Sequence, residues 1–199
     1  MKTSEQTIVD KKAEILEAAH ACFVRKGFHN TTMQDICQQA GMSAGNIYRY
    51  FDSKEKIIEV FAQEELQWMK IAIADVPSSP NLLQAILDTI FWTATTLTEE
   101  NKSELIAELF AEAGRNPRVN AIYTKFHKQL SQHVCHMLQE LEDNNLLRCV
   151  HDKQLVAKIL ISLVDGIVLG KIITPDFDMT NMRPVIETMI KSLFAKRQE

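Results

Sequence analysis

The spacing of apolar residues along the chain predicts a protein built almost entirely from helices. Over residues 10–26, Ile15, Ala19 and Cys22 recur three or four positions apart, as on one face of a helix. Comparable patterns predict further helices at residues 33–40, 44–50, 54–74, 80–98, 101–113, 117–142, 152–170 and 182–196. We therefore expect an all-α protein of about nine helices, with a polar arm over residues 1–9 and no strand.

Several of these helices carry capping signals at their ends. Thr32 and Asp35 have the spacing of a capping box, and Gly41 and Ser43 are suited to end one short helix and begin the next. Ser79-Pro80 and Asn116-Pro117 each combine a capping residue with a proline in the first helical position.

Composition and charge allow a DNA-binding protein without pointing to one. The 199 residues are 46% hydrophobic and carry a net charge of −4, which excludes a disordered chain. Residues 1–60 hold 8 Lys or Arg and 8 Asp or Glu, so the acidic excess lies in the rest of the chain. A neutral domain can still bind phosphates if its basic residues share one face. With neither a signal-peptide core nor an apolar run long enough to cross a membrane, we expect a cytoplasmic protein.

Motifs for catalysis or metal binding are weak. The four cysteines include no C-x-x-C pair, so we expect buried or partly buried reduced thiols. His127, His133, Cys135 and His136 do not converge on one helix face, and the single E-x-x-H at residues 17–20 lacks the partners of a di-iron site. We expect no enzyme, no metal and no cofactor, although a helical enzyme with a His/Cys site remains an alternative.

Residues 32–50 form the strongest functional pattern. They predict two short helices joined by Gly-Met-Ser, and helices this short persist only when packed on longer ones. The expected packing residues are Phe23, Ile36, Ala40, Ile47, Phe51 and Ile58. This arrangement is a helix-turn-helix, whose second helix enters the major groove of DNA.

The outward side of the second helix suits contacts with DNA. Asn46 can pair with adenine, and Ala44 can touch a thymine methyl group. Residues at both ends of the segment can donate to phosphates. The candidate DNA-binding residues are Thr31, Thr32, Met33, Ser43, Ala44, Gly45, Asn46, Tyr48, Arg49, Tyr50 and Lys54. The aromatic run at residues 48–51 could alternatively be a packing cluster.

The segments at residues 27–36 and 40–55 closely resemble the TetR family of bacterial repressors. The shared motifs are a G-x-x-x-T-T opening, an A-G-x-S-x-G turn, a Y-x-x-F end and an S-K-E entry to the next helix. Asn46 departs from the Thr or Ser that members often carry. The resemblance implies a DNA-binding domain at residues 1–53 and a ligand-binding and dimerisation domain at residues 54–199, linked by the helix at residues 54–74.

The resemblance also implies a homodimer on a palindromic operator, with a small-molecule effector that releases the repressor. The implied dimer interface is Leu155, Ile159, Leu163, Ile167, Val185, Met189 and Leu193. The candidate pocket residues are Trp68, Phe91, Trp92, Phe110, Phe126, Leu130, His133 and Met137. This lining suits an apolar or aromatic effector. The alternatives are a transcriptional activator of the same fold and a helical ligand-binding protein without DNA binding.

Overall fold

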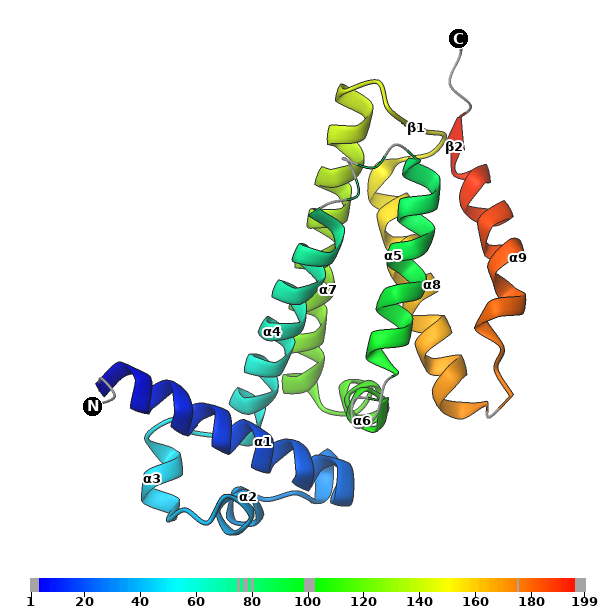
Figure 1. Ribbon diagram of the computed structural model, residues 1–199. Helices are drawn as coiled ribbons and strands as arrows, with labels where there is room; N and C mark the ends of the chain where they lie inside the picture. Colours follow the sequence, from blue (N-terminus) through cyan, green and yellow to red (C-terminus); the bar gives the residue numbers. More distant parts are fainter. Residues whose placement is uncertain are drawn as a thin grey trace. The chain divides into compact units, whose positions relative to one another are not determined.

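The structure, a computed structural model, describes residues 4–74, 76, 79, 81–98, 103–174 and 176–195. Within this part of the chain there are nine helices and two strands of two residues each (Figure 1). The helices are α1 (Ser4–Asn30), α2 (Met33–Ala40), α3 (Ala44–Tyr48), α4 (Lys54–Ala74), α5 (Leu82–Leu97), α6 (Ser103–Ala113), α7 (Pro117–Asp143), α8 (Lys153–Ile173) and α9 (Met179–Ser192). The strands are β1 (Arg148–Cys149) and β2 (Phe194–Ala195). The predicted all-α class is confirmed.

The chain divides into two compact units, and the division differs from the expected boundary after residue 53. The first unit comprises Met1–Gln63 and Glu104–Thr124, and the second comprises Glu64–Ser103 and Lys125–Glu199. Helices α4 and α7 therefore contribute residues to both units, and α6 belongs to the first. The sequence did not indicate this, because α6 packs on residues about 80 positions earlier in the chain.

The first unit holds α2 and α3 against α1 around a small apolar core (Figure 1). All six packing residues expected from the sequence take part in this core, with Ala40 at its partly buried edge. Phe23 and Phe28 contact each other with ring centroids 5.2 Å apart. This core gives α2 and α3 the tertiary support that their length requires.

Gly27 produces a kink near the end of α1 and brings α6 close to it. Its backbone, at φ 73° and ψ 159°, is essentially restricted to glycine. A Cβ at this position would lie 2.7 Å from Oε2 of Glu108 on α6. The same carboxylate accepts a hydrogen bond of 3.0 Å from the Phe28 amide, so α6 is fixed to the end of α1. Gly27 was expected to end the helix, and it interrupts it instead.

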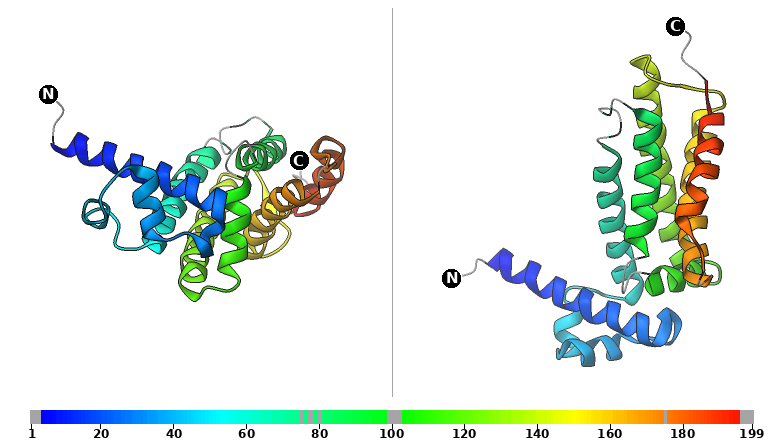
Figure 2. Two further views of the ribbon diagram at one scale, coloured as in Figure 1. Left: turned by 90° about the horizontal axis from the view of Figure 1, so that it is seen from below. Right: turned by 45° about the vertical axis from the view of Figure 1, so that its right-hand side comes forward.

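In the second unit, α5 contacts both α8 and α9, and the helices run alongside one another (Figures 1 and 2). Asn81, Asp152 and Asp178 cap the N-termini of α5, α8 and α9 by accepting from backbone amides. The strands β1 and β2 pair antiparallel, with Cys149 opposite Phe194. No helix within the described ranges is both long and apolar enough to span a bilayer.

Several predicted helix boundaries were wrong. Residues 4–9, expected as a polar arm, are helical in α1. The cap of α5 is Asn81 rather than Ser79, and Pro80 lies outside the described residues. Asp178 starts α9 at Met179, three residues earlier than predicted, and Lys196 at its predicted end is also outside the described residues. The two strands were missed because a pattern of two residues has no readable period.

Candidate DNA interface and effector cavity

Helix α3 is set at its angle to α2 by a tight turn. Gly41 adopts the left-handed conformation at φ 63°, and its amide donates to the carbonyls of Cys37 and Gln38. Ser43 then begins α3 by accepting, through its hydroxyl, a hydrogen bond of 3.4 Å from the Asn46 amide. Ile47 is the buried residue of α3, and it fixes which side of this short helix faces outward.

A capping box stabilises the start of α2, as the sequence predicted. The Asp35 amide donates to the Thr32 hydroxyl at 3.1 Å, and the Thr32 amide donates to the Asp35 carboxylate at 2.9 Å. Lys26 pairs with the same carboxylate at 2.6 Å. These hydrogen bonds, the one from Lys26 first, hold the pKa of Asp35 well below its usual range.

The outward face of α3 is open to solvent. Ser43, Ala44, Gly45 and Arg49 are exposed, and half of the Tyr48 side chain is accessible. Next to it, a shallow hollow is lined by Gln34, Cys37, Gln38, Ala44 and Tyr48. Gln34 and Gln38 lie one helical turn apart on α2 and are exposed, yet neither was among the predicted DNA contacts. Residues four positions apart lie on one face of a helix, and this spacing of the two glutamines could have identified them from the sequence.

Two of the predicted phosphate contacts have structural roles instead. Thr31 is 1% exposed, and its hydroxyl donates to the carbonyls of Cys22 and Gly27. The Lys54 ammonium donates to the carbonyls of Phe28, His29 and Thr31 at 2.8, 3.2 and 2.9 Å. It also lies 4.5 Å from the Phe28 ring centroid. Lys54 thus fixes the start of α4 to the end of α1 with all three of its donors.

The remaining predicted DNA contacts are partly buried or exposed. Met33 and Tyr50 pack on the edge of the core, so only part of each side chain reaches solvent. Asn46 is half-buried, and Thr32 is exposed. The aromatic run is therefore only partly a packing cluster, since Phe51 is a core residue while Tyr48 is accessible.

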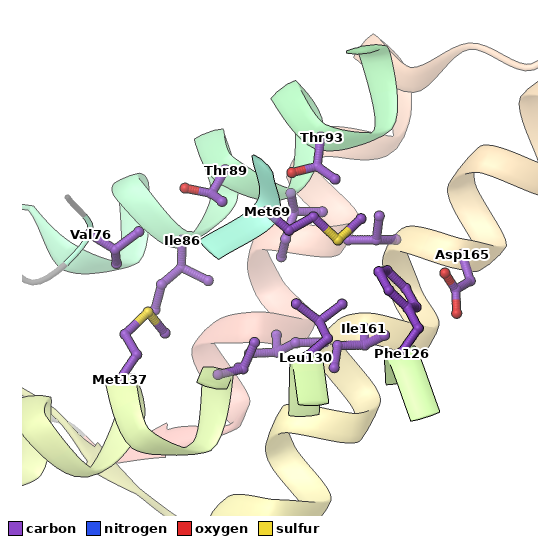
Figure 3. Close-up of a pocket in the computed structure, with 14 residues that line it drawn as sticks. Met69, Val76, Ile86, Thr89, Thr93, Phe126, Leu130, Met137, Ile161 and Asp165 are labelled. Atoms are coloured by element: carbon purple, nitrogen blue, oxygen red, sulfur yellow. The ribbon is translucent and has the colours of Figure 1, made fainter. Parts of the chain in front are cut away.

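The second unit contains a cavity enclosed by α4, α5, α7 and α8 (Figure 3). It encloses about 80 Å³. Its fourteen lining residues are Met69, Val76, Ile86, Thr89, Ile90, Thr93, Phe126, Leu130, Val134, Met137, Leu160, Ile161, Val164 and Asp165. These described residues are almost all apolar, and Asp165 is the charged one among them.

Only part of the predicted pocket lines this cavity. Phe126, Leu130 and Met137 do so, with Leu130 one turn after Phe126 on α7 and Met137 two turns further on. Trp68 and Trp92 instead stack on each other with centroids 4.7 Å apart, and His133 is half-buried elsewhere on α7.

Two further predicted pocket residues lie in other surroundings. Phe91 lies against the Arg183 guanidinium, whose carbon is 5.0 Å from the ring centroid, and Arg183 also pairs with Asp88. Phe110 belongs to the first unit and packs on Tyr123. The error on α5 has a physical cause: the helix is apolar around most of its circumference, so its sequence does not indicate which side faces the cavity.

Asp165 stands at one end of the cavity, beside Phe126 (Figure 3). Its Oδ2 lies 3.8 Å from Nε2 of His127 on α7. Burial raises the pKa of Asp165 to about 6 and lowers the pKa of His127. Both shifts favour the neutral forms, as expected for ionisable groups beside an apolar wall.

An apolar stripe is exposed on α8 and α9. Leu155, Ile159, Val185 and Met189 are 58%, 55%, 62% and 53% exposed, and each pair lies one turn apart on its helix. Leu163 and Leu193 are half-buried. Ile167, predicted as an interface residue, is 3% exposed because it faces the core of its own chain. It is therefore removed from the predicted interface.

Sequence comparisons identify relatives of both parts of the chain. Residues 15–61 match the family described as "Bacterial regulatory proteins, tetR family", and residues 81–195 match "BetI-type transcriptional repressor, C-terminal". The HTH-type transcriptional regulator UidR of Escherichia coli K12 is 23% identical over 158 residues, covering 78% of this chain and 79% of that protein. YfiR of Bacillus subtilis 168, an uncharacterized HTH-type transcriptional regulator, is 29% identical over 165 residues, covering 79% and 78%.

Solved structures share the fold. Salmonella enterica GusR superposes with a TM-score of 0.80 at 23% identity, over 92% of this chain and 95% of that one. A SmeT–triclosan complex superposes with a TM-score of 0.74 at 18% identity, over 94% and 92%.

Proposed function

Because the chain belongs to the TetR family of bacterial regulatory proteins and is a helix-turn-helix transcriptional regulator, we propose that it acts as a homodimeric repressor released by an apolar effector. Ligand-responsive regulation is characteristic of this family. We infer repression rather than activation from the C-terminal match, which is described as that of a repressor. A cytoplasmic location follows from the proposal, since the DNA target lies there.

The observation that carries the DNA-binding proposal is the exposed face of α3. Small residues at its start, Ser43 to Gly45, allow close approach to base edges, while Asn46 supplies an amide for adenine. Tyr48 and Arg49 are accessible and suited to phosphates. We add Gln34 and Gln38 of α2 to this interface and leave out Thr31 and Lys54, whose donors are used within the protein.

The proposed dimer uses the exposed apolar stripe of α8 and α9, defined as Leu155, Ile159, Val185 and Met189. A two-fold dimer would present two α3 helices to successive major grooves, about 34–36 Å apart on a palindromic site. Such a contact is isologous, so one stripe covers the other.

The proposed effector site is the cavity between α4, α5, α7 and α8. Its lining supports an apolar or aromatic ligand, and the fold neighbour SmeT was solved with triclosan. At about 80 Å³ the cavity is small beside the roughly 300–1,000 Å³ of typical ligand pockets. Met69 and Met137 can adopt other rotamers to admit a larger ligand. Widening the cavity would displace α4, whose first turn is fixed to α1 by Lys54.

DNA binding can be tested by fluorescence anisotropy with the intergenic DNA that flanks the gene. We expect Asn46→Ala to weaken binding roughly tenfold or more, the value of one bidentate base contact, and Tyr48→Ala to weaken it as well. The matched control is Asn144→Ala, an exposed asparagine of the second unit, which should bind like the unmodified protein. If neither α3 variant loses affinity, the proposed surface is wrong.

A further inference from the structure

The effector cavity combines an apolar lining with a single acidic group. The fourteen described residues that line it include no lysine or arginine, and Thr89 and Thr93 are the uncharged polar ones among them. The Thr89 hydroxyl donates to the Ala85 carbonyl of its own helix at 2.8 Å, so its proton is already engaged. The carboxylate of Asp165 is therefore the one charged group available to a bound molecule (Figure 3).

Nothing among the lining residues compensates the charge of this carboxylate. Nε2 of His127 lies 3.8 Å from its Oδ2, and burial lowers the pKa of that histidine. At neutral pH the histidine is thus uncharged while Asp165, with a pKa of about 6, is mostly ionised. An ionised carboxylate beside apolar side chains is unfavourable unless a positive charge pairs with it.

We propose that the effector of this cavity is a hydrophobic molecule with a single positive charge, such as a protonated amine, which pairs with the Asp165 carboxylate. The inference rests on the proposed function, because it assigns the ligand class of the same cavity. Phe126 lies beside Asp165 and offers its ring to the same cation. The hydrophobic part of the molecule would extend between α5 and α7 toward Met137 at the other end.

The same geometry argues against an anionic effector. A carboxylate or phosphate on the ligand would enter beside Asp165 with no lysine or arginine in the lining to bind it. A neutral ligand could donate a hydrogen bond to Asp165. Such a ligand would leave the negative charge of the carboxylate uncompensated, whereas a cation would neutralise it, so we expect the cation to bind roughly tenfold more tightly.

The test uses three probes that differ only in their terminal group: 4-phenylbutylamine, 4-phenylbutanol and 4-phenylbutyrate. Each is titrated into the full-length protein by calorimetry at pH 7.5. We expect the amine to bind about tenfold more tightly than the alcohol, and the butyrate to bind more weakly than either. This comparison needs no variant, so it does not depend on the folding of one.

Two variants then test whether Asp165 causes the preference for the amine. Asp165→Asn should bring the affinity of the amine to or below that of the alcohol, because the ammonium would then enter an apolar cavity without a compensating negative charge. Asp176→Asn makes the same change at an exposed site after α8 and should keep the full preference for the amine. Thermal melts establish that both variants are folded.

The outcomes separate this inference from the proposed function. If the alcohol or the butyrate binds as tightly as the amine, or if Asp165→Asn retains the preference, the cationic assignment fails while the cavity remains the effector site. If none of the three probes binds, the cavity itself is not the effector site, and both proposals fail. An amine preference that Asp165→Asn removes supports both.

Discussion

Asp165 is a residue whose burial works against stability. Its pKa is raised by burial to about 6, whereas an aspartate in an unfolded chain titrates near 3.9. Well below pH 3.9 the group is neutral in both states and costs nothing. As the pH rises toward 6, Asp165 ionises in the unfolded chain but stays largely protonated in the folded protein. The folded state therefore loses stability. Above pH 6 the cost is complete.

Replacing this carboxylate should therefore stabilise the protein, but only at higher pH. We expect Asp165→Asn to raise the free energy of unfolding at pH 7.5 by about 1–2 kcal/mol, a figure reduced for the part of the side chain that reaches solvent. The gain should be mostly lost at pH 4. Urea denaturation at the two pH values measures it, and an equal gain at both would contradict this account of burial.

A stabilising substitution at this position would also fit a functional role. Proteins commonly retain unfavourable ionisable groups where ligand binding needs them. His127, held 3.8 Å away on α7, stays neutral near pH 7 because burial lowers its pKa. The cost of the lone charge therefore remains until a ligand offsets it.

Among the elements, the junction of α1 with α4 and α6 connects the DNA-binding helices to the rest of their unit. Lys54 at the start of α4 donates to three carbonyls at the end of α1. Glu108 of α6 accepts from the Phe28 amide beside the kink at Gly27. Glu112, buried one turn later on α6, binds Arg115 and Asn116 at 2.7 and 2.8 Å. The contacts of Lys54 and Glu108 fix the position of α1, on which α2 and α3 are packed.

Lys54→Met should destabilise the protein by roughly 1.5–3 kcal/mol, because it removes charge-assisted hydrogen bonds to helix-end carbonyls but keeps the aliphatic stem. The matched control, Lys56→Met, removes an exposed pair with Glu59 and should cost no more than about 0.5 kcal/mol. Chemical denaturation gives both values.

The same variant decides between the structural role and a phosphate contact. Removing one phosphate contact lowers the slope of log affinity against log salt by about 0.9. For Lys54→Met we expect an unchanged slope with weaker binding, whereas a reduced slope would restore Lys54 to the DNA interface.

At the scale of the whole molecule, the main feature is the exposed apolar stripe of α8 and α9. Packing within a single chain does not explain why these side chains are apolar. Four large apolar side chains more than half exposed, grouped on two helices of one unit, are typical of an interaction surface rather than of scattered surface residues. Burial of one such side chain stabilises an association by about 1.5–3 kcal/mol.

Ile159→Asp should therefore convert the proposed dimer to a monomer, since it would bury a charge against its own copy. Sedimentation velocity at micromolar concentration measures the mass. Ile71→Asp provides the control, because Ile71 is 64% exposed on α4 and lies outside the stripe. If Ile159→Asp keeps the mass of the unmodified protein, another surface or no surface mediates association.

The local signals in the sequence determined the helical elements and the DNA-binding motif. Thr32, Gly41 and Ser43 act on neighbours within four residues, so their capping and turn geometry could be read directly from the chain. The helical spacing of apolar residues likewise predicted Ile36 and Ile47 as core residues, and both are buried.

The tertiary structure alone decided which residues share a site. Lys54 and Thr31 have the chemistry of phosphate contacts, but carbonyls at the end of α1 use their donors. Trp92 was predicted to line the pocket but is half exposed, whereas Asp165, which was not among the predicted residues, lines the cavity. Their positions depend on how α5 and α8 rotate when packed against other helices, and an apolar helix does not encode that rotation in its own period.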